Sequence, residues 1–398
     1  MTNHAVIVDA VRTASGKGKP GGALSAVHPV DLLAGVLREL VRRNDLDPAH
    51  VDDVIGGCVT QAGEQSLNIT RNAVFAAGFP ETVPATTVDR QCGSSQQAAA
   101  FAAQGVLAGC YDIVIAAGVE SMSRAPMFSA TGGADPYGRA VAQRYPDGLV
   151  TQGVSAEIIA SRWKLDRQAL DEFAVRSHRL AAAATAAGTF TGEIVPVPVV
   201  AADGTNGTHH VDETMRAATS VEGLSALPPA FQGDPAGGRF PEINWSITAG
   251  NSSPLTDGAA AVLIMSEQMA ARLSLRPRAR FHSFSVTGDD PILMLTGIIP
   301  ATRKALDRAG LSIDDIDAYE VNEAFAPVPL AWLNDVAADP DRLNQQGGAI
   351  ALGHALGASG ARLLTTLVTT LEQTGGRYGL QAMCEGGGMA NATIIERL

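Results

Sequence analysis

The chain has 398 residues and a net charge of −12, with 46% hydrophobic and 18% charged residues. This length and composition exclude a disordered chain and indicate a globular protein with two or three domains or one large duplicated core. The negative charge argues against a general nucleic-acid-binding or anionic-membrane surface, although a small basic site for a phosphorylated ligand stays compatible with it.

The first predicted elements alternate between strands and helices, as in an α/β fold. Residues 5–8 are expected to form a buried strand, residues 28–44 an amphipathic helix and residues 112–118 a fully apolar strand. Between the last two, a strand at residues 87–88 is followed by a tight turn and a buried helix at residues 98–108. The first third of the sequence is therefore predicted to form one α/β unit.

The amino-acid composition of the chain changes after residue 122. Residues 123–148 are rich in Gly, Pro and Ala and predict an extended loop. Two helices follow, at residues 155–163 and 167–187, the second capped by Asp166. Residues 257–265 then predict a run from helix to strand.

The C-terminal part repeats the first α/β unit. Aligning Val51 with Ile313 gives an offset of 262 residues, and the same offset carries Cys92 onto His354. Both residues then lie at equivalent turns that could face each other. The predicted domains are an N-terminal half, an inserted loop domain and a C-terminal half, at residues 1–123 with 248–273, 124–247 and 274–398, respectively.

Cysteine usage argues against a disulfide framework or a zinc site. Cys58, Cys92, Cys110 and Cys384 form no Cys-x-x-Cys pair, and no zinc-ligand spacing of histidines lies beside them. No targeting signal or membrane span is recognised, so a cytoplasmic protein is expected.

Cys92 has the placement of a nucleophile. At a helix start, free N–H groups and the macrodipole stabilise a thiolate, so a low pKa is predicted for this thiol. The alternative is a buried thiol that only fills the core, which is the commoner role of a cysteine.

Three further residues combine reactive groups with glycine-rich or strand-end positions. His354, with glycines nearby on both sides, suits a base close to a thiol, or else a hydrogen-bonded core histidine. Cys384 precedes three glycines whose N–H groups can point at an oxyanion, or else ends a buried strand. Asn322 can hold a water or a carbonyl, or else cap a turn.

Four motifs resemble those of the thiolase family in order and spacing, and the resemblance extends from residue 11 to the C-terminus. The motifs are Cys92-Gly93-Ser94, Asn322-Glu323-Ala324-Phe325, the glycine-rich segment 347–360 and Cys384-Glu385-Gly386-Gly387-Gly388. The resemblance implies an α/β fold in which duplicated βαβαβαββ halves form a five-layered αβαβα core with an inserted loop domain.

The resemblance also implies roles for the reactive residues. Cys92 would carry the acyl group as a thioester, His354 would deprotonate Cys92 or the CoA thiol, and Cys384 would be the acid and base at the acetyl α-carbon. His354 and a water held by Asn322 would form one oxyanion hole. The N–H groups of Cys92 and Gly386 would form the other.

The ligands that the resemblance implies are coenzyme A and acyl-CoA as substrates, with no tightly bound cofactor, no metal, no nucleic acid and no membrane. A homodimer or homotetramer is expected. The residues that match the family's CoA contacts are Arg216, Leu227, Ala230, Phe231, Ala249, Ser253, Leu255, Ala324 and Phe325.

The chain departs from the short-chain biosynthetic pattern of the family. Thr151-Gln152 stands where His-Met is usual, Ala355 and Ile298 replace prolines, and the segment 231–248 is longer. These changes favour thiolytic cleavage of 3-ketoacyl-CoA with longer or bulkier acyl groups, as in degradative thiolases of lipid and steroid breakdown. The alternatives are an acetoacetyl-CoA-forming acetyltransferase, a ketoacyl-synthase-type condensing enzyme and a non-catalytic CoA-binding subunit.

Overall fold

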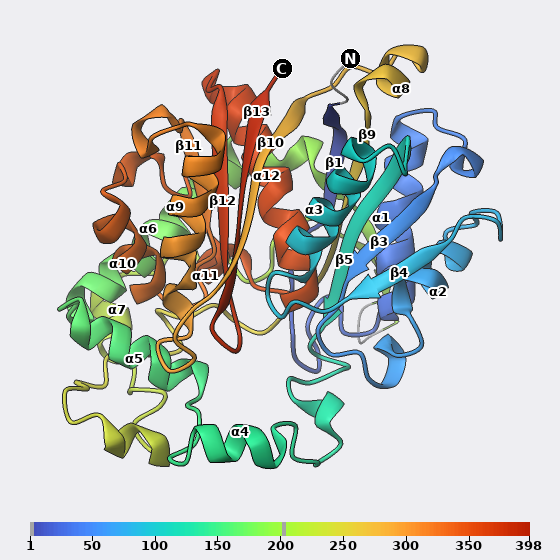
Figure 1. Ribbon diagram of the computed structural model, residues 1–398. Helices are drawn as coiled ribbons and strands as arrows, with labels where there is room; N and C mark the ends of the chain where they lie inside the picture. Colours follow the sequence, from blue (N-terminus) through green and yellow to red (C-terminus); the bar gives the residue numbers. More distant parts are fainter. Residues whose placement is uncertain (1–3, 201–203) are drawn as a thin grey trace.

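The computed structural model describes residues 4–200 and 204–398 of the chain (Figure 1). Residues 1–3, which belong to the stretch predicted to carry no leader, lie outside the described part. No described helix has the length and apolar character that crossing a membrane requires.

Within the described residues, eleven strands form one sheet, and nine of them follow the order β11-β12-β13-β10-β1-β9-β5-β3-β4. The two halves of this sheet join where β1 pairs with β10 through Val6–Arg280 and Ile7–Ala279. The strands of the first half are β1 (Ala5–Thr13), β3 (Asp53–Gly57), β4 (Ala85–Val88), β5 (Ile113–Ser121) and β9 (Thr256–Ser266). Those of the second half are β10 (Ala279–Gly288), β11 (Ala318–Val321), β12 (Tyr378–Glu385) and β13 (Met389–Arg397).

The remaining strands are short. β2 (Gly16–Lys17) pairs with β9, and β6 (Ile194–Val195) pairs with β1. β7 (Val197–Val200) and β8 (Asn206–His209) form a separate antiparallel pair.

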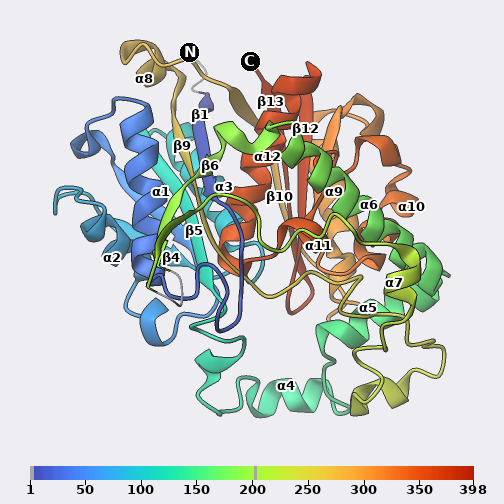
Figure 2. The ribbon, with the colours of Figure 1, turned by 180° about the vertical axis from the view of Figure 1, so that it is seen from behind.

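Helices and strands alternate in five layers (Figures 1 and 2). The central layer contains α3 (Ser94–Leu107) and α12 (Ser359–Thr374), which pack between the two halves of the sheet. Outside the first half lie α1 (Pro29–Arg43) and α2 (Ile69–Ala76), and outside the second lie α9 (Ile298–Ala309) and α10 (Pro327–Val336). The predicted five-layered αβαβα core is confirmed.

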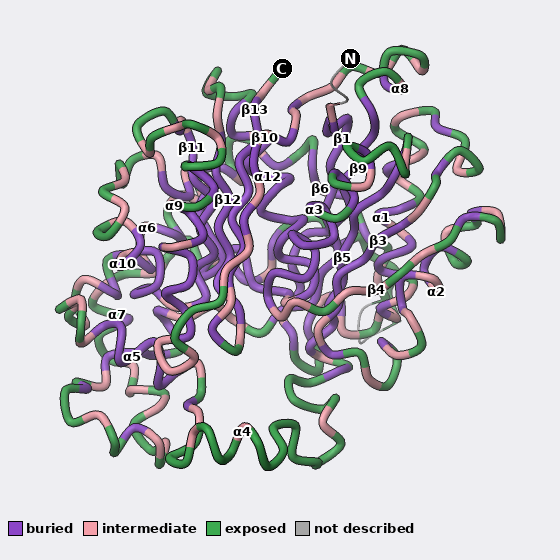
Figure 3. Tube along the Cα trace, viewed as in Figure 1, coloured by how far each residue is buried: buried purple, intermediate pink, exposed green. Residues whose placement is uncertain are grey.

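Small residues let the two central helices approach closely. A Cβ at Gly360 would lie 2.2 Å from the backbone nitrogen of Gln96, so α12 touches the start of α3 at this point. Ala98, Ala99 and Ala102 of α3 are buried in the same apolar cluster as Ala361 of α12. The core therefore sits around these helices, and the exposed residues lie at the periphery (Figure 3).

The predicted internal repeat is present, with a different register from the one expected. The central helices begin at Ser94 and Ser359, which is an offset of 265 residues rather than 262. Cys92 and His354 both lie in the turns before these helices, but the helix register places Gly357, not His354, opposite Cys92. Short insertions between the motifs explain why one offset does not fit every element.

The segment between β5 and β9 covers one end of the core. It contains α4 (Gly138–Arg144), α5 (Gln152–Arg162), α6 (Arg167–Ala186) and α7 (Val221–Ser225). The carboxylate of Asp166 accepts a hydrogen bond from the Ala169 N–H at 2.8 Å, which confirms the predicted cap of α6. The residue boundaries of the inserted domain and of the two halves stay a prediction.

Two secondary-structure expectations were wrong. Residues 138–144 form α4 within the stretch expected to be an extended loop, although this helix is exposed (Figure 3). Residues 256–266 are strand throughout, because pairing with both β1 and β5 outweighs the helix propensity of the alanine run. Two short helices complete the chain, α8 (Glu267–Arg272) and α11 (Ala349–Leu352).

Candidate active site

Cys92 lies in the turn between β4 and α3, one residue before the N-cap Gly93. The turn is closed by Ser94, whose hydroxyl donates to the Gln91 carbonyl at 2.6 Å and accepts from the Arg90 N–H at 2.9 Å. Cys92 is 5% exposed and packs with Leu363 of α12. The turn thus holds the thiol at the junction of the two halves.

The predicted low pKa of Cys92 was wrong for the resting protein. Burial, followed by the negative charge of Glu385, raises the pKa of this thiol to about 12. A hydrogen bond from the Gln152 side chain, at the start of α5, acts in the opposite direction. Loss of solvation therefore outweighs the helix start, and the resting thiol is neutral.

His354 lies in the turn before α12, and its neighbours define its tautomer. The Ser359 hydroxyl donates its single proton to the Ala355 carbonyl at 2.9 Å, so it accepts from the imidazole Nδ1, which lies 2.6 Å away. Nδ1 therefore carries the proton, and Nε2 is the unprotonated nitrogen. Nε2 accepts a hydrogen bond from the side-chain amide of Asn322 at 3.4 Å.

The imidazole is neutral as well. Burial, followed by the positive charge of Arg362, lowers the pKa of His354 to about 3. Its backbone N–H donates to the Thr256 hydroxyl at 2.9 Å, which ties the turn to β9. The side chain is thus a fixed, unprotonated base.

Asn322 follows β11 and is held by the neighbouring strand. Its N–H donates to the Ala382 carbonyl at 3.0 Å. The next residue, Glu323, accepts hydrogen bonds from the Ser177 hydroxyl at 2.7 Å and the Asn344 amide at 2.8 Å. This buried carboxylate fixes the segment that leads toward His354.

Cys384 is at the end of β12 and is 1% exposed. Burial raises the pKa of this thiol well above its usual value, and the charge of Cys92 is the next cause, which places the two sulfur atoms close enough to interact. Gly386 follows in the hairpin, where an added Cβ would lie 3.2 Å from the Gln91 side-chain oxygen. The β12–β13 hairpin therefore lies against the Cys92 turn.

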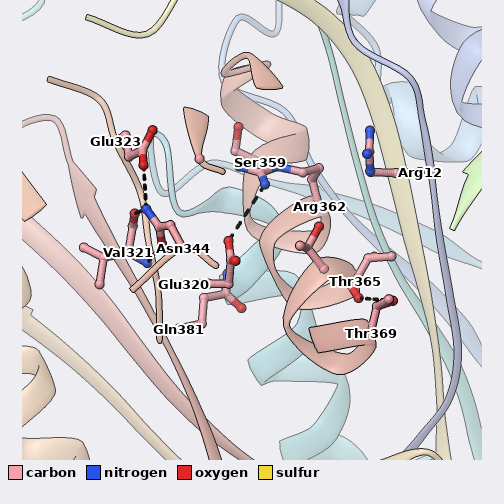
Figure 4. A network of polar contacts seen from close by, with 12 residues as sticks. Arg12, Glu320, Val321, Glu323, Asn344, Ser359, Arg362, Thr365, Thr369 and Gln381 are labelled. Atoms are coloured by element: carbon pink, nitrogen blue, oxygen red, sulfur yellow. Dashed lines mark hydrogen bonds and ion pairs between the residues drawn. The ribbon is translucent and has the colours of Figure 1, made fainter. Parts of the chain in front are cut away.

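A network of buried charged side chains, which includes Arg362, lies near His354 (Figure 4). Arg362 extends from α12 toward Glu320 of β11, with 3.9 Å between the two side chains. Burial, partly offset by Arg362, raises the pKa of Glu320 to about 8. Arg12 of β1 is paired separately, with Glu193 at 2.7 Å and Asp212 at 2.8 Å.

Part of the expected CoA-contacting set lies beside the catalytic candidates. The N–H and hydroxyl of Ser253 donate to the Ala324 carbonyl at 3.0 and 3.1 Å. The rings of Phe231 and Phe325 meet edge to face, with centroids 6.0 Å apart. Leu255 forms a β-bridge with His354 and is 52% exposed, so it is an accessible apolar side chain next to the base.

The other members of that set also lie in the segment between β5 and β9. Leu227 packs near Gly250, and the Ala230 N–H donates to the Ile247 carbonyl at 2.8 Å. Ala249 is exposed. Arg216 is exposed too, and its backbone N–H donates to His178 of α6 at 3.2 Å.

Three residues of the site, Gln152, Ser359 and Glu385, have no role that the sequence alone predicts. Gln152 departs from the short-chain pattern, but its hydrogen bond to Cys92 depends on how α5 docks on the core. Ser359 lies five residues after His354, a spacing that could have suggested a contact across the turn. Within residues 4–200 and 204–398, no group of three or more His, Cys, Asp or Glu side chains could hold a metal ion.

Comparisons with known proteins cover nearly the whole chain. The family model "Thiolase, N-terminal domain" matches residues 5–268, and "Thiolase, C-terminal domain" matches residues 275–397. The steroid 3-ketoacyl-CoA thiolase FadA6 of Mycobacterium tuberculosis is 50% identical over 406 residues, covering 100% of this chain and 95% of that protein. A 3-ketoacyl-CoA thiolase of Serratia proteamaculans is 45% identical over 399 residues, with 99% and 100% covered. The crystal structure of the Bacillus anthracis acetyl-CoA acetyltransferase matches with a TM-score of 0.89 and 37% identity, over 100% of this chain and 99% of that one.

Proposed function

The chain belongs to the thiolase family and is an acyltransferase, and on this premise we propose that it cleaves 3-ketoacyl-CoA with CoA to give acetyl-CoA and a shortened acyl-CoA. The reverse reaction is a Claisen condensation at the same site. The observation that carries the proposal is the neutral base His354, whose unprotonated Nε2 accepts from Asn322 at the junction that also holds two buried cysteines.

In the first step, the Cys92 sulfur attacks the 3-keto carbonyl, and the thiol proton passes to Nε2 of His354. Because thiol and imidazole are both neutral at rest, the proton leaves during the attack rather than before it. The N–H groups of Cys92 and Gly386 are the proposed donors to the oxyanion.

The carbon–carbon bond then breaks, and the electron pair goes to the acetyl-CoA enolate. Cys384 gives its proton to the enolate carbon, while His354 and a water held by Asn322 stabilise the enolate oxygen. The high pKa of the buried Cys384 thiol keeps it protonated and ready to donate.

Before the last step, the proton on Nε2 of His354 passes to the Cys384 thiolate, which restores the neutral imidazole and the Cys384 thiol. His354 then accepts the proton of an incoming CoA thiol, whose sulfur attacks the acyl group on Cys92. This releases the shortened acyl-CoA and the Cys92 thiolate, which takes the proton back from His354. CoA is thus a substrate rather than a tightly bound cofactor, and the expected CoA contacts are those of Arg216 and the apolar residues around Phe231 and Phe325.

The proposed substrates carry acyl groups longer or bulkier than acetoacetyl. Support comes from Gln152 beside Cys92 in place of the methionine usual in short-chain enzymes, and from a relative whose name states steroid 3-ketoacyl-CoA substrates. We also propose a cytoplasmic homodimer or homotetramer, for which light scattering coupled to size-exclusion chromatography gives the mass in solution.

A chain-length series in the cleavage direction tests the function. We expect kcat/KM to be higher for 3-ketoacyl-CoA substrates with long or polycyclic acyl groups than for acetoacetyl-CoA. A strong preference for acetoacetyl-CoA would favour the biosynthetic acetyltransferase instead. No acetyl-CoA release and no acyl adduct on Cys92 with any substrate would leave only a CoA-binding role.

A further inference from the structure

Two buried glutamates occupy equivalent positions in the two halves. Glu120 is near the end of β5 and Glu385 at the end of β12, and they are related by the same 265-residue offset as the central helices. Each faces the turn of the opposite half. The Gly357 N–H donates to Glu120 at 2.8 Å, and a Cβ on Gly93 would lie only 1.9 Å from Oε1 of Glu385.

The two carboxyl groups differ in their partners. Besides Gly357, Glu120 accepts from the N–H groups of Val59 at 2.9 Å and Thr60 at 3.0 Å, and from the Gln65 amide at 2.9 Å. All four partners are donors, so this site requires a carboxylate that only accepts.

Glu385 has no such donors. It is fully buried, and within the described part of the chain neither of its oxygens takes part in a hydrogen bond. The side-chain oxygen of Asn391, which also lies near Gly93, has no described donor either. Arg90 is the nearby cation, but its buried Nε also has no described partner. An unpaired acceptor nearby suits a protonated acid, because a buried anion that accepts no hydrogen bond carries a large desolvation cost.

We propose that Glu385 is a positioning residue that stays a neutral carboxylic acid at the contact between the Cys92 turn and the Cys384 strand, and that its ionisation suppresses formation of the Cys92 thiolate. Its side chain packs against Gly93 and so fixes the spacing between the two cysteine-bearing elements. In the neutral state it adds no negative charge where a thiolate must form.

The charges around Glu385 support this role. Burial raises its pKa to about 9, Arg90 opposes that shift and Asp89 adds to it. The other titratable groups that face it are the thiols: the Glu385 charge is the second cause of the raised Cys92 pKa and also raises that of Cys384. Asn391, from β13, is uncharged. Ionisation of Glu385 above about pH 9 would therefore oppose a thiolate at either cysteine.

The test is the pH dependence of Cys92 alkylation by iodoacetamide, followed at that residue by peptide mass spectrometry. This inference rests on the proposed role of Cys92, but alkylation requires no thiolase turnover, so the two proposals can fail separately. We expect the ratio of the Glu385→Gln rate to the wild-type rate to rise several-fold between about pH 8 and about pH 10, because the amide cannot ionise.

The matched control is Glu120→Gln, which removes the equivalent carboxylate. Its amide would face four donors, so we expect a lower Tm and a smaller change in the rate ratio. A Glu385→Gln ratio that is independent of pH, or one that Glu120→Gln reproduces, would overturn the proposal. Infrared difference spectra at pH 7 provide a second readout: the carbonyl band of a protonated acid should be present in the wild type and lost in Glu385→Gln, and its absence from the wild type would also refute the idea.

Discussion

The two halves of the core share one architecture but contribute different chemistry. In each, a turn precedes a central helix, α3 in the first half and α12 in the second, although the strand β4 leads into the first turn and the short helix α11 leads into the second. The first turn holds Cys92, which has Gly357 as its counterpart in the helix register. The end of β12, in the second half, holds Cys384, whose counterpart is Val119 of β5. His354 occupies the second turn, and the same register gives it Asp89 as its counterpart.

The comparison shows that duplication supplies the geometry and single residues supply the reactivity. In each half, a glutamate side chain also reaches the turn of the other half. Glu120 accepts hydrogen bonds from several donors and is a structural carboxylate, whereas Glu385, the proposed neutral acid, has no described donor. Changes that exchange or remove these differences should therefore affect chemistry more than folding.

The largest effect is expected from Cys92→Ala, which removes the thiol from the first turn. Thiolytic cleavage should fall by about 10⁴-fold or more, because Cys92 is the proposed carrier of the acyl intermediate. Steady-state release of acetyl-CoA measures this. Cys110→Ser, at an exposed cysteine, is the matched control and should keep wild-type activity. Retained turnover in Cys92→Ala would contradict the asymmetry between the turns.

Cys384→Ala removes the thiol from the end of β12. Cleavage should fall by about 10²- to 10⁴-fold through loss of general acid catalysis, while Cys92 is still acylated slowly by an acyl-CoA. Intact-protein mass spectrometry detects that adduct. Loss of acylation together with cleavage would show that the two cysteines do not have separate tasks.

Gly93→Ala adds a Cβ where the first half has none. Its counterpart in the helix register, Ala358, already carries one, so Ala358→Gly is the reciprocal control. The new Cβ would collide with Glu385 and displace the Cys92 turn, so kcat/KM should fall by about 10- to 100-fold. Thermal unfolding separates this displacement from general destabilisation. Wild-type kcat/KM in Gly93→Ala would show that the contact does not set the site geometry.

The smallest effect concerns His354 and stability. Its pKa of about 3 in the folded protein lies below the unfolded value of 6.5, so the unfolded chain takes up the proton first as the pH falls. The stabilising contribution is therefore present above pH 6.5 and is lost progressively toward pH 3.

Urea unfolding of the wild type and His354→Gln at several pH values checks this sign. The free energy of unfolding of the wild type minus that of His354→Gln should decrease by up to about 1.4 kcal/mol per pH unit below pH 6.5. His210→Gln, at an exposed histidine, is the control. An advantage that grows as the pH falls would mean that the folded protein holds a protonated His354.

The sequence by itself determined the elements whose signals are local. The apolar spacing in α1 and the Asp166 cap of α6 depend on residues within one or two turns, so these helices were predictable. The repeat likewise indicated a duplicated α/β core, and the resemblance of the motifs to the thiolase family implied its five layers and the importance of the Cys92 and His354 turns.

Tertiary structure decided what depends on distant neighbours. β9 is a strand because β1 and β5 pair with it on both edges, whatever its alanines prefer. The thiol of Cys92 has a high pKa because burial and Glu385, 293 positions further along the chain, outweigh a local helix start. The tautomer of His354 depends on the hydrogen bond that the Ser359 hydroxyl donates to the Ala355 carbonyl. Desolvation and proton sharing are properties of the assembled site, so no local pattern in the sequence encodes them.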